Sequence, residues 1–415
     1  MRFRIHHGAA EIGGNCIEIQ AERKSIVLDL GLPLEAAGAD KNLLPPIPGL
    51  LDGDNPDLLG VVVSHPHGDH HGLLASADPS IQVYMGDGAR RLLEAVAPFI
   101  SANSFPQLVT AYRNRETFTV GPFHITPFLM DHSAFDAYAL LVEADGRRLL
   151  YSGDFRAHGR KAWAFDAFLS DPPTNVDALL MEGTLLGREG DTGPTSEEAL
   201  EASIVDSIRN TDGLVLACFS PQNIDRFVTF YKAALRSNRQ FIADVYTATI
   251  LNALALPTLP APSSASSSMR VYLPKRQKHR IVRTQRFDLV EPYRQLRIFP
   301  SDISARPERW VMMFRSSMIE DLDELDCLAG GLLIYSLWPG YLERGQTDLR
   351  SWCADKGMAF EVQHTSGHAF VDDLKRFVDA VAARKVVPIH TRQPKAYQGL
   401  FANVEVHPNG VWADV

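Results

Sequence analysis

The sequence predicts an α/β protein built from a strand-rich part and a module in which strands and helices alternate. Apolar stretches of about four to eight residues, typical of strands, dominate residues 1–194. From about residue 195 such stretches alternate with helical ones, which indicates a small parallel sheet. A histidine-rich loop directly after one early strand carries the strongest chemical signal in the chain.

The first part is expected to consist mainly of strands with polar residues at their ends. Strands are predicted at 2–5, 16–20, 25–30, 60–63, 123–129 and 176–181, with a helix at 88–100. A hairpin is predicted at 137–143 and 148–152, because the intervening Asp145-Gly146 is a strong signal for a tight turn.

The second part should begin with a helix near residue 195. Thr195 and Glu198 have the spacing of a capping box, which predicts a helix to about residue 210. Further strands are predicted at 214–218, 241–245, 310–314 and 331–336, and a helix at 223–235. A final helix at 369–382 and strands at 386–389 and 404–407 follow.

Composition limits the protein's class. The chain has 415 residues, 45% hydrophobic and 22% charged, enough for two or three domains of a soluble globular protein. No stretch approaches the roughly 20 apolar residues of a membrane helix, and residues 1–5 alternate like a strand rather than a signal peptide. Four scattered cysteines favour a reducing cytoplasm. Because the net charge is −9, any nucleic-acid site must be local.

Residues 64–72 read SHPHGDHHG at the end of an apolar strand. Imidazole and carboxylate suit zinc and similar divalent ions. His65 and His67 alternate in an extended segment and can converge on one ion, while Asp69 and His70 can face a second. One loop that serves two ions is what a two-metal hydrolase needs. The alternative interpretation is a polar surface loop.

Two more candidate ligands, His132 and Asp154, each follow an apolar strand. Either one alone could be an ordinary turn residue. A carboxylate has two oxygens with which to bridge two cations, so Asp154 is the predicted bridge. Asp29 is expected to orient a ligand imidazole by accepting its free N–H, or else to cap the turn before Gly31.

The pattern His65-x-His67-x-Asp69-His70 resembles the signature of the metallo-β-lactamase superfamily. Glu182, His368 in Ser-Gly-His and His390 in Pro-Ile-His match three further motifs of its β-CASP branch, above all the ribonuclease J-like nucleases. The resemblance implies an αββα sandwich with a metal site at one edge and an inserted α/β β-CASP-like cap. The expected domains are therefore 1–194 and 346–415 for the sandwich and 195–345 for the cap.

The resemblance also implies two Zn²⁺ per chain, with Mn²⁺ as the alternative. His65, His67 and His132 would hold one ion, and Asp69, His70 and His390 the other, with Asp154 shared. Asp69, Glu182 and His368 are the implied catalytic residues, with His368 as the general acid and Glu182 orienting it. Within the family a histidine at the position of His390 is associated with RNA-processing members, which favours RNA.

Several residues of the inserted module are candidate phosphate contacts. A helix start can hold phosphate through its backbone N–H groups, although an ordinary capped turn explains the same pattern. The candidates are Ser220, Asn223, Arg226, Arg315, Ser316 and Ser366. Residues 270–297 add nine Lys/Arg and three aromatic residues, which suit a polyanion or, alternatively, a solvated face or a subunit contact.

We therefore predict a hydrolase that cleaves single-stranded RNA through a metal-bound hydroxide, with DNA as an alternative substrate and no membrane partner. Endonucleolytic and 5′-exonucleolytic cleavage both stay open, as does oligomeric state, because the further C-terminal domain of bacterial ribonuclease J has no counterpart here. The alternatives are a small-molecule hydrolase acting on a thioester, lactone or cyclic phosphodiester, a DNA nuclease, and a non-catalytic RNA-binding scaffold.

Overall fold

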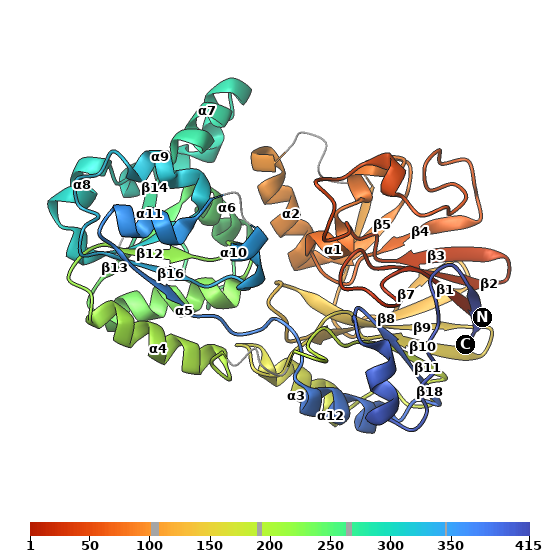
Figure 1. Cartoon of the computed structure of the whole chain (residues 1–415). Helices are drawn as coiled ribbons and strands as arrows, with labels where there is room; N and C mark the ends of the chain where they lie inside the picture. Colours follow the sequence, from red (N-terminus) through yellow and green to blue (C-terminus); the bar gives the residue numbers. More distant parts are fainter. Residues whose placement is uncertain (101–107, 189–192, 263–267, 345–346) are drawn as a thin grey trace. The chain divides into compact units, whose positions relative to one another are not determined.

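The computed structural model describes residues 1–100, 108–188, 193–262, 268–344 and 347–415 (Figure 1). Its contacts divide the chain into two compact units, one of Met1–Asp191 with Gly367–Val415 and one of Thr192–Ser366. The predicted domain boundary at 345/346 lies outside the described residues, so the assignment of 195–345 as an inserted domain stays a proposal. In the described part of the chain, no helix has the length and apolar character needed to cross a bilayer.

The first unit contains two sheets. One has seven strands in the order β19-β1-β2-β3-β4-β5-β6. Their bounds are β1 (Arg2–His7), β2 (Cys16–Ala21), β3 (Lys24–Leu28), β4 (Leu58–Val62), β5 (Val83–Gly86), β6 (Val109–Tyr112) and β19 (Trp412–Asp414). The last strand pairs antiparallel with the first, so both ends of the chain lie in this sheet.

The other sheet has six strands in the order β18-β11-β10-β9-β8-β7. Their bounds are β7 (Phe118–Val120), β8 (Phe123–Met130), β9 (Ala137–Ala144), β10 (Arg147–Tyr151), β11 (Ala178–Glu182) and β18 (Lys385–Ile389). The predicted hairpin is confirmed: β9 and β10 pair antiparallel across Asp145 and Gly146, which both have positive φ as this tight turn requires.

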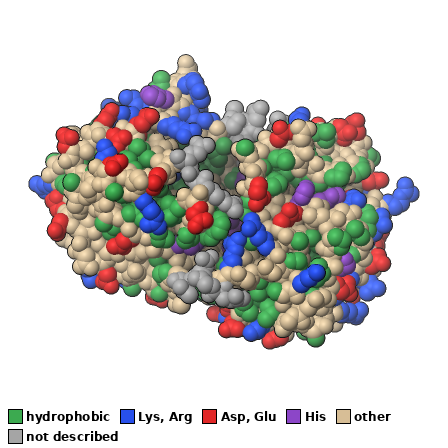
Figure 2. Space-filling model, viewed as in Figure 1, with side chains coloured by type: hydrophobic (Ala, Val, Ile, Leu, Met, Phe, Trp, Pro, Cys, Tyr) green, Lys and Arg blue, Asp and Glu red, His purple; other side chains and the backbone are tan. Residues whose placement is uncertain are grey.

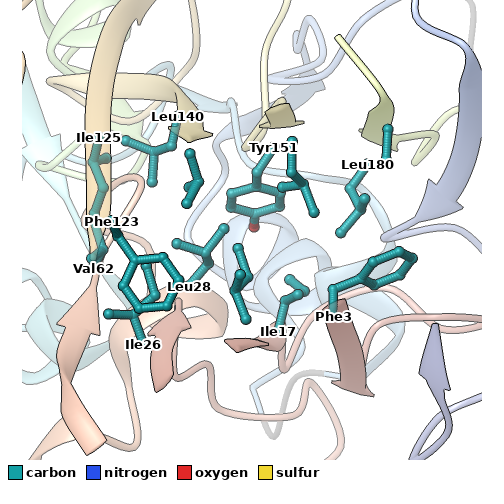
Figure 3. Close-up of a cluster of buried hydrophobic side chains, with 14 of the residues drawn as sticks. Phe3, Ile17, Ile26, Leu28, Val62, Phe123, Ile125, Leu140, Tyr151 and Leu180 are labelled. Atoms are coloured by element: carbon teal, nitrogen blue, oxygen red, sulfur yellow. The ribbon is translucent and has the colours of Figure 1, made fainter. Parts of the chain in front are cut away.

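The two sheets face each other across a hydrophobic core. Ile17, Leu28 and Val62 of the first sheet pack with Phe123 and Leu140 of the second (Figure 3). Burying one face of each sheet is the main stabilisation of such a sandwich, at about 25 cal/mol per Å² of apolar surface.

Helices cover the outer faces of the sandwich. α2 (Asp87–Ile100) contacts β5 and β6 of the first sheet. On the second sheet, Phe165 and Phe168 of α3 (Ala162–Ser170) and Phe377 of α12 (Val371–Val381) join the cluster of buried residues on the outer face. The predicted αββα architecture is therefore confirmed (Figure 1).

The second unit is a six-stranded sheet in which every pair of neighbours is parallel, as predicted, in the order β14-β13-β15-β12-β16-β17. Its strands are β12 (Val215–Cys218), β13 (Gln240–Asp244), β14 (Met269–Tyr272), β15 (Trp310–Phe314), β16 (Leu332–Tyr335) and β17 (Ala359–Val362). Its helices are α4 (Glu197–Arg209), α5 (Ile224–Arg236), α6 (Val245–Leu254), α7 (Lys275–Thr284), α8 (Pro300–Ala305), α9 (Ile319–Leu322), α10 (Gly340–Arg344) and α11 (Leu349–Asp355).

Two local predictions are wrong. The expected strand at 404–407 is reduced to an isolated bridge between Val404 and Val386, because Val406 is exposed and the chain turns away before β19. The N-cap of α4 is Ser196 rather than Thr195, since the Ser196 side chain accepts a hydrogen bond from the Ala199 N–H.

Candidate metal centre

All seven predicted metal ligands lie in the first unit, at the ends of its strands. His65 and His67 follow β4, and Asp69 and His70 lie in the short helix α1 (Gly68–His71) that comes next. The others are His132 after β8, Asp154 after β10 and His390 after β18. Strand ends deliver side chains to one edge of the sandwich, which is why residues so distant in the sequence meet.

The seven side chains and His368 form overlapping groups, and within each group the ligand atoms lie within 4.8 Å of one another. These groups are His65, His67 and His132; His65, His70 and Asp154; Asp69, His70 and His390; and Asp154, His368 and His390. Asp154 lies centrally: its Oδ2 is 3.1 Å from His70 Nε2 and 3.7 Å from the Nε2 atoms of both His65 and His390. One carboxylate thus faces both predicted ligand sets.

The donor atoms fit divalent ions. His65 Nε2, His132 Nδ1, His390 Nε2 and Asp154 Oδ1 are buried and have no hydrogen-bond partner among the described residues. Leaving such an atom unsatisfied costs about 1–3 kcal/mol, so a cluster of four calls for a partner. Cations of the zinc type, which prefer imidazole nitrogen and carboxylate oxygen, would satisfy His65 Nε2, His390 Nε2 and Asp154 Oδ1. His132 instead faces the cluster through its Nε2, which lies 3.2 Å from His67 Nδ1.

Electrostatics keep most of these imidazoles in the neutral form that binds metal. Burial holds the pKa of His65 and of His132 well below the usual range and lowers the pKa of His67 to about 4. For His70, burial is outweighed by the carboxylates of Asp154 and Asp29, which raise its pKa. Metal binding at His70 would therefore release a proton.

His368 lies at the edge of the cluster, paired with Glu182. Its Nδ1 is 3.2 Å from Glu182 Oε1, and Glu182 is itself fixed by the backbone N–H groups of Phe155 and Thr184. Burial opposes a charge on His368, but Glu182 and Asp154 outweigh it and raise the pKa of His368 to about 9. The imidazole is therefore protonated at neutral pH.

Asp29 lies within hydrogen-bond distance of one predicted ligand, His70. Its carboxylate is buried and accepts hydrogen bonds from the Ser64 N–H, the Ser64 hydroxyl, the Tyr151 hydroxyl and His70 Nδ1. Gly31 nearby permits the close approach of the metal loop, because a Cβ there would lie 1.7 Å from the Asp69 carbonyl oxygen.

Three partners of the ligands were not predicted: Asn15, Ser64 and Tyr151. Asn15 Oδ1 lies 3.0 Å from His390 Nδ1, although the two residues are 375 positions apart. Ser64 could have been found from the sequence, because it directly precedes His65 in the histidine loop. Asn15 and Tyr151 could not, because no spacing rule connects them with a metal loop.

The candidate phosphate contacts all lie in the second unit. Arg226 is fully buried, and its guanidinium donates to Glu197, Ser336 and the Thr365 carbonyl, so its N–H groups are satisfied within the unit. Asn223 caps α5 by accepting from the Arg226 N–H. This geometry gives both residues a structural role, and we do not carry them into the proposed function.

The remaining phosphate candidates are more accessible. Ser220 and Ser366 are half-buried and Ser316 is exposed. Arg315 is half-buried, pairs with the buried carboxylate of Asp244 and packs over the Tyr246 ring. Burial lowers the pKa of Arg315 to about 10, so the guanidinium stays charged at neutral pH.

Comparisons with known proteins agree with this fold. Residues 27–203 match a family described as beta-lactamase superfamily domain, and residues 358–398 match a Zn-dependent metallo-hydrolase RNA specificity domain. A crystal structure of a protein of unknown function from Enterococcus faecalis V583 superposes with a TM-score of 0.81 and 21% identity, covering 100% of this chain and 99% of that one.

Relatives of similar sequence bear the name ribonuclease J. That of Sinorhizobium meliloti is 25% identical over 249 residues, covering 57% of this chain and 43% of the relative. The ribonuclease J of Mycobacterium tuberculosis H37Rv is 25% identical over 421 residues, covering 94% of this chain and 68% of the relative. An RNase J-like protein of Methanocaldococcus jannaschii is 22% identical over 264 residues, covering 59% and 58%. The chain thus spans less than half of the first of these relatives.

The αββα sandwich with histidines and aspartates at its strand ends agrees with the match of residues 27–203 to the beta-lactamase superfamily domain. The chain's relatives of similar sequence include proteins named ribonuclease J and RNase J-like, and residues 358–398 resemble an RNA specificity domain.

Proposed function

We propose that this protein is a two-metal phosphodiesterase that cleaves single-stranded RNA. The observation that carries the proposal is a buried cluster of seven candidate ligands with His368, paired with Glu182, at its edge. The ligand side chains of His65, His70, His132, Asp154 and His390 are at most 1% exposed, whereas those of Asp69 and His368 retain 19% and 22%. Asp69 and His368, two of the three predicted catalytic residues, are therefore accessible to substrate, as is the half-buried ligand His67, whereas Glu182 is buried.

The protein's own residues would divide the chemistry between them. Divalent metal ions held by the seven ligands would supply Lewis acidity and lower the pKa of a water molecule. His368 would hold a proton on its imidazolium and give it to the departing 3′ oxygen, an effect of about 10²–10⁴-fold. Glu182 would keep His368 charged and correctly oriented, since two backbone N–H groups fix its carboxylate.

RNA as the substrate is supported by the relatives and by one surface. The matched RNA specificity domain, 358–398, contains His368 and His390. On the second unit, helix α7 carries the exposed cations Arg276, Lys278 and Arg283 (Figure 2). Zinc as the native metal, cytoplasmic location, DNA cleavage and oligomerisation stay predictions from the sequence.

The test is cleavage of 5′-labelled and internally labelled single-stranded RNA by wild type and Asp69→Ala, with metal content measured on both. We expect wild type to cleave RNA, and the variant to lose about one metal ion per chain and at least 10²-fold in rate. Short labelled products from the 5′ end would indicate exonucleolytic cleavage, and internal fragments endonucleolytic cleavage.

Asp52→Ala is the matched control, since Asp52 is an exposed carboxylate outside the cluster. Single-stranded DNA and bis-p-nitrophenyl phosphate are tested in parallel. If wild type holds two metal ions yet leaves both nucleic acids intact, the nuclease proposal fails and a small-molecule hydrolase takes its place.

A further inference from the structure

A continuous chain of buried hydrogen bonds runs behind the metal ligands, on the side away from Asp154. It begins at His390, whose Nδ1 is 3.0 Å from Asn15 Oδ1. Asn15 Nδ2 donates to the Tyr151 hydroxyl at 3.2 Å, and that hydroxyl donates to Asp29 Oδ2 at 2.5 Å. The chain therefore links a ligand near the C-terminus to a carboxylate near the N-terminus.

At Asp29 the chain divides toward two more ligands. His70 Nδ1 lies 2.7 Å from Asp29 Oδ2. The Ser64 hydroxyl donates to the same oxygen at 2.8 Å and lies 3.0 Å from His65 Nδ1. Three ligand imidazoles therefore have their Nδ1 atoms on one connected network.

The donors and acceptors of the network can be assigned without ambiguity. The Asn15 oxygen and the Asp29 carboxylate can only accept, so the Nδ1 atoms of His390 and His70 must carry protons. The single Ser64 hydroxyl proton goes to Asp29, so the hydroxyl oxygen must accept from a protonated His65 Nδ1. In each of the three rings Nε2 is therefore the nitrogen left to bind a metal ion, and His70 does so once it has released its second proton.

Those three Nε2 atoms point to one place. They lie 3.1–3.7 Å from Asp154 Oδ2, and two of them, on His65 and His390, have no hydrogen-bond partner in the described part of the protein. The backbone of Asn15 adds to the arrangement: its N–H donates to the Asp69 carbonyl, and its carbonyl accepts from the Gly31 N–H. Asn15 thus contacts the two ends of the ligand set, Asp69 and His390, at once.

We propose that Asn15 and Tyr151 are positioning residues of the metal centre, which fix the tautomer and ring orientation of His390 and join it to the Asp29 network that holds His70 and His65. This inference rests on the metal centre of the proposed function and not on its substrate. Because Asn15 acts directly on His390, its loss affects chiefly the ion of the Asp69, His70 and His390 group.

The test is titration of metal-free protein with Co²⁺, followed by its visible absorption, which reports each ion separately from any activity. Asn15→Leu keeps the size of the side chain but removes the acceptor. We expect one binding step to weaken about 10–100-fold while the other is unchanged. Asn15→Asp restores an acceptor for His390 Nδ1 and should return that step toward the wild-type affinity.

Tyr151→Phe and Tyr138→Phe form a matched pair, since each removes one buried phenol that donates to an aspartate, Asp29 or Asp136. The first should weaken Co²⁺ binding and the second should not. Unchanged binding in Asn15→Leu, or equal weakening in Asn15→Leu and Asn15→Asp, would overturn the positioning role. Absence of Co²⁺ binding in wild type would instead remove the metal centre itself, and with it both proposals.

Discussion

Two residues of the metal centre, Asp29 and His390, adopt left-handed backbone conformations with φ of 58° and 49°. Non-glycine residues rarely do so, because Cβ crowds the backbone at a cost on the order of 1 kcal/mol. Both are held there by hydrogen bonds of their side chains and backbone, including the His390 N–H to the Gly8 carbonyl. The strain marks positions where the direction of one side chain matters more than local backbone preference.

At the scale of single residues, His368 predicts a pH dependence of stability. Its pKa is raised from about 6.5 in the unfolded chain to about 9 in the fold. Its contribution is therefore fully present below pH 6.5 and is lost as the pH rises through about 9. As the pH rises over this interval, the free energy of unfolding of metal-free wild type should fall by roughly 1–3 kcal/mol relative to that of His368→Gln.

Urea unfolding at several pH values, followed by circular dichroism, measures this difference. His124→Gln, an exposed histidine on β8, serves as the control and should track wild type throughout. Parallel stability curves for wild type and His368→Gln would mean that the pair with Glu182 does not raise the pKa of His368.

At the scale of elements, helix α7 has an unfavourable arrangement of charge. Its first turn carries Lys275, Arg276 and Lys278 and no acidic residue, although the N-terminal end of a helix dipole repels cations. Lys275 is paired with Glu324, whereas Arg276, Lys278 and Arg283 have no ion-pair partner within the described ranges. On a protein with a net charge of −9, this surface is a candidate local site for a polyanion.

We expect the triple variant Arg276→Gln, Lys278→Gln and Arg283→Gln to bind single-stranded RNA more weakly and with less dependence on salt. Each phosphate contact that is lost lowers the slope of log K against log salt concentration by about 0.7, so three contacts lower it by roughly 2. Fluorescence anisotropy of a labelled oligonucleotide at several salt concentrations measures the slope.

A control variant removes three exposed cations elsewhere, Arg23→Gln, Lys41→Gln and Lys232→Gln. Equal slopes in the two triple variants would show that α7 acts only through net charge. An unchanged slope in the α7 variant would assign this helix to a solvated face.

At the scale of the whole molecule, one unit contains the entire metal centre, although its chain is interrupted. The segment before residue 192 provides Glu182 and six of the ligands, from His65 to Asp154. The segment after residue 366 provides His368 and the seventh ligand, His390. β18 brings His390 into place by pairing with β11, whose last residue is Glu182. The centre therefore forms only when the two segments of the sandwich assemble.

This arrangement predicts where metal ions stabilise the protein. Saturating Zn²⁺ should slow amide hydrogen exchange around residues 64–71, 131–133, 153–156 and 389–391. The reason is that a free ion concentration of 1,000 times the Kd stabilises the fold by about 4 kcal/mol. Peptides of β12 and β13 in the second unit should be unaffected. Mass spectrometry of exchange in metal-free and Zn²⁺-loaded protein measures both, with Ca²⁺ as a control ion that prefers oxygen ligands. Uniform protection across both units would contradict a centre confined to the first.

Much of the fold could be predicted from local patterns. Apolar stretches indicated most strands of both units, the Asp145-Gly146 turn indicated the β9–β10 hairpin, and strand–helix alternation indicated a parallel sheet. Short strands such as β5, β7 and β17 escaped prediction, because three or four residues hold too little periodicity. Residues 404–407 have the apolar pattern of a strand, but they pair with β18 only through one isolated bridge, between Val404 and Val386.

The sequence by itself predicted which chemical groups the candidate centre contains, because strand-end histidines and aspartates with this spacing have few uses other than metal binding. Only the tertiary structure decided which groups support them. Asn15 and Tyr151 reach His390 and Asp29 through contacts between distant strands, and Arg226, a candidate phosphate contact by sequence, is fully engaged inside its own unit. Hydrogen-bond partners are set by three-dimensional proximity, and residue spacing encodes that proximity only within a single element.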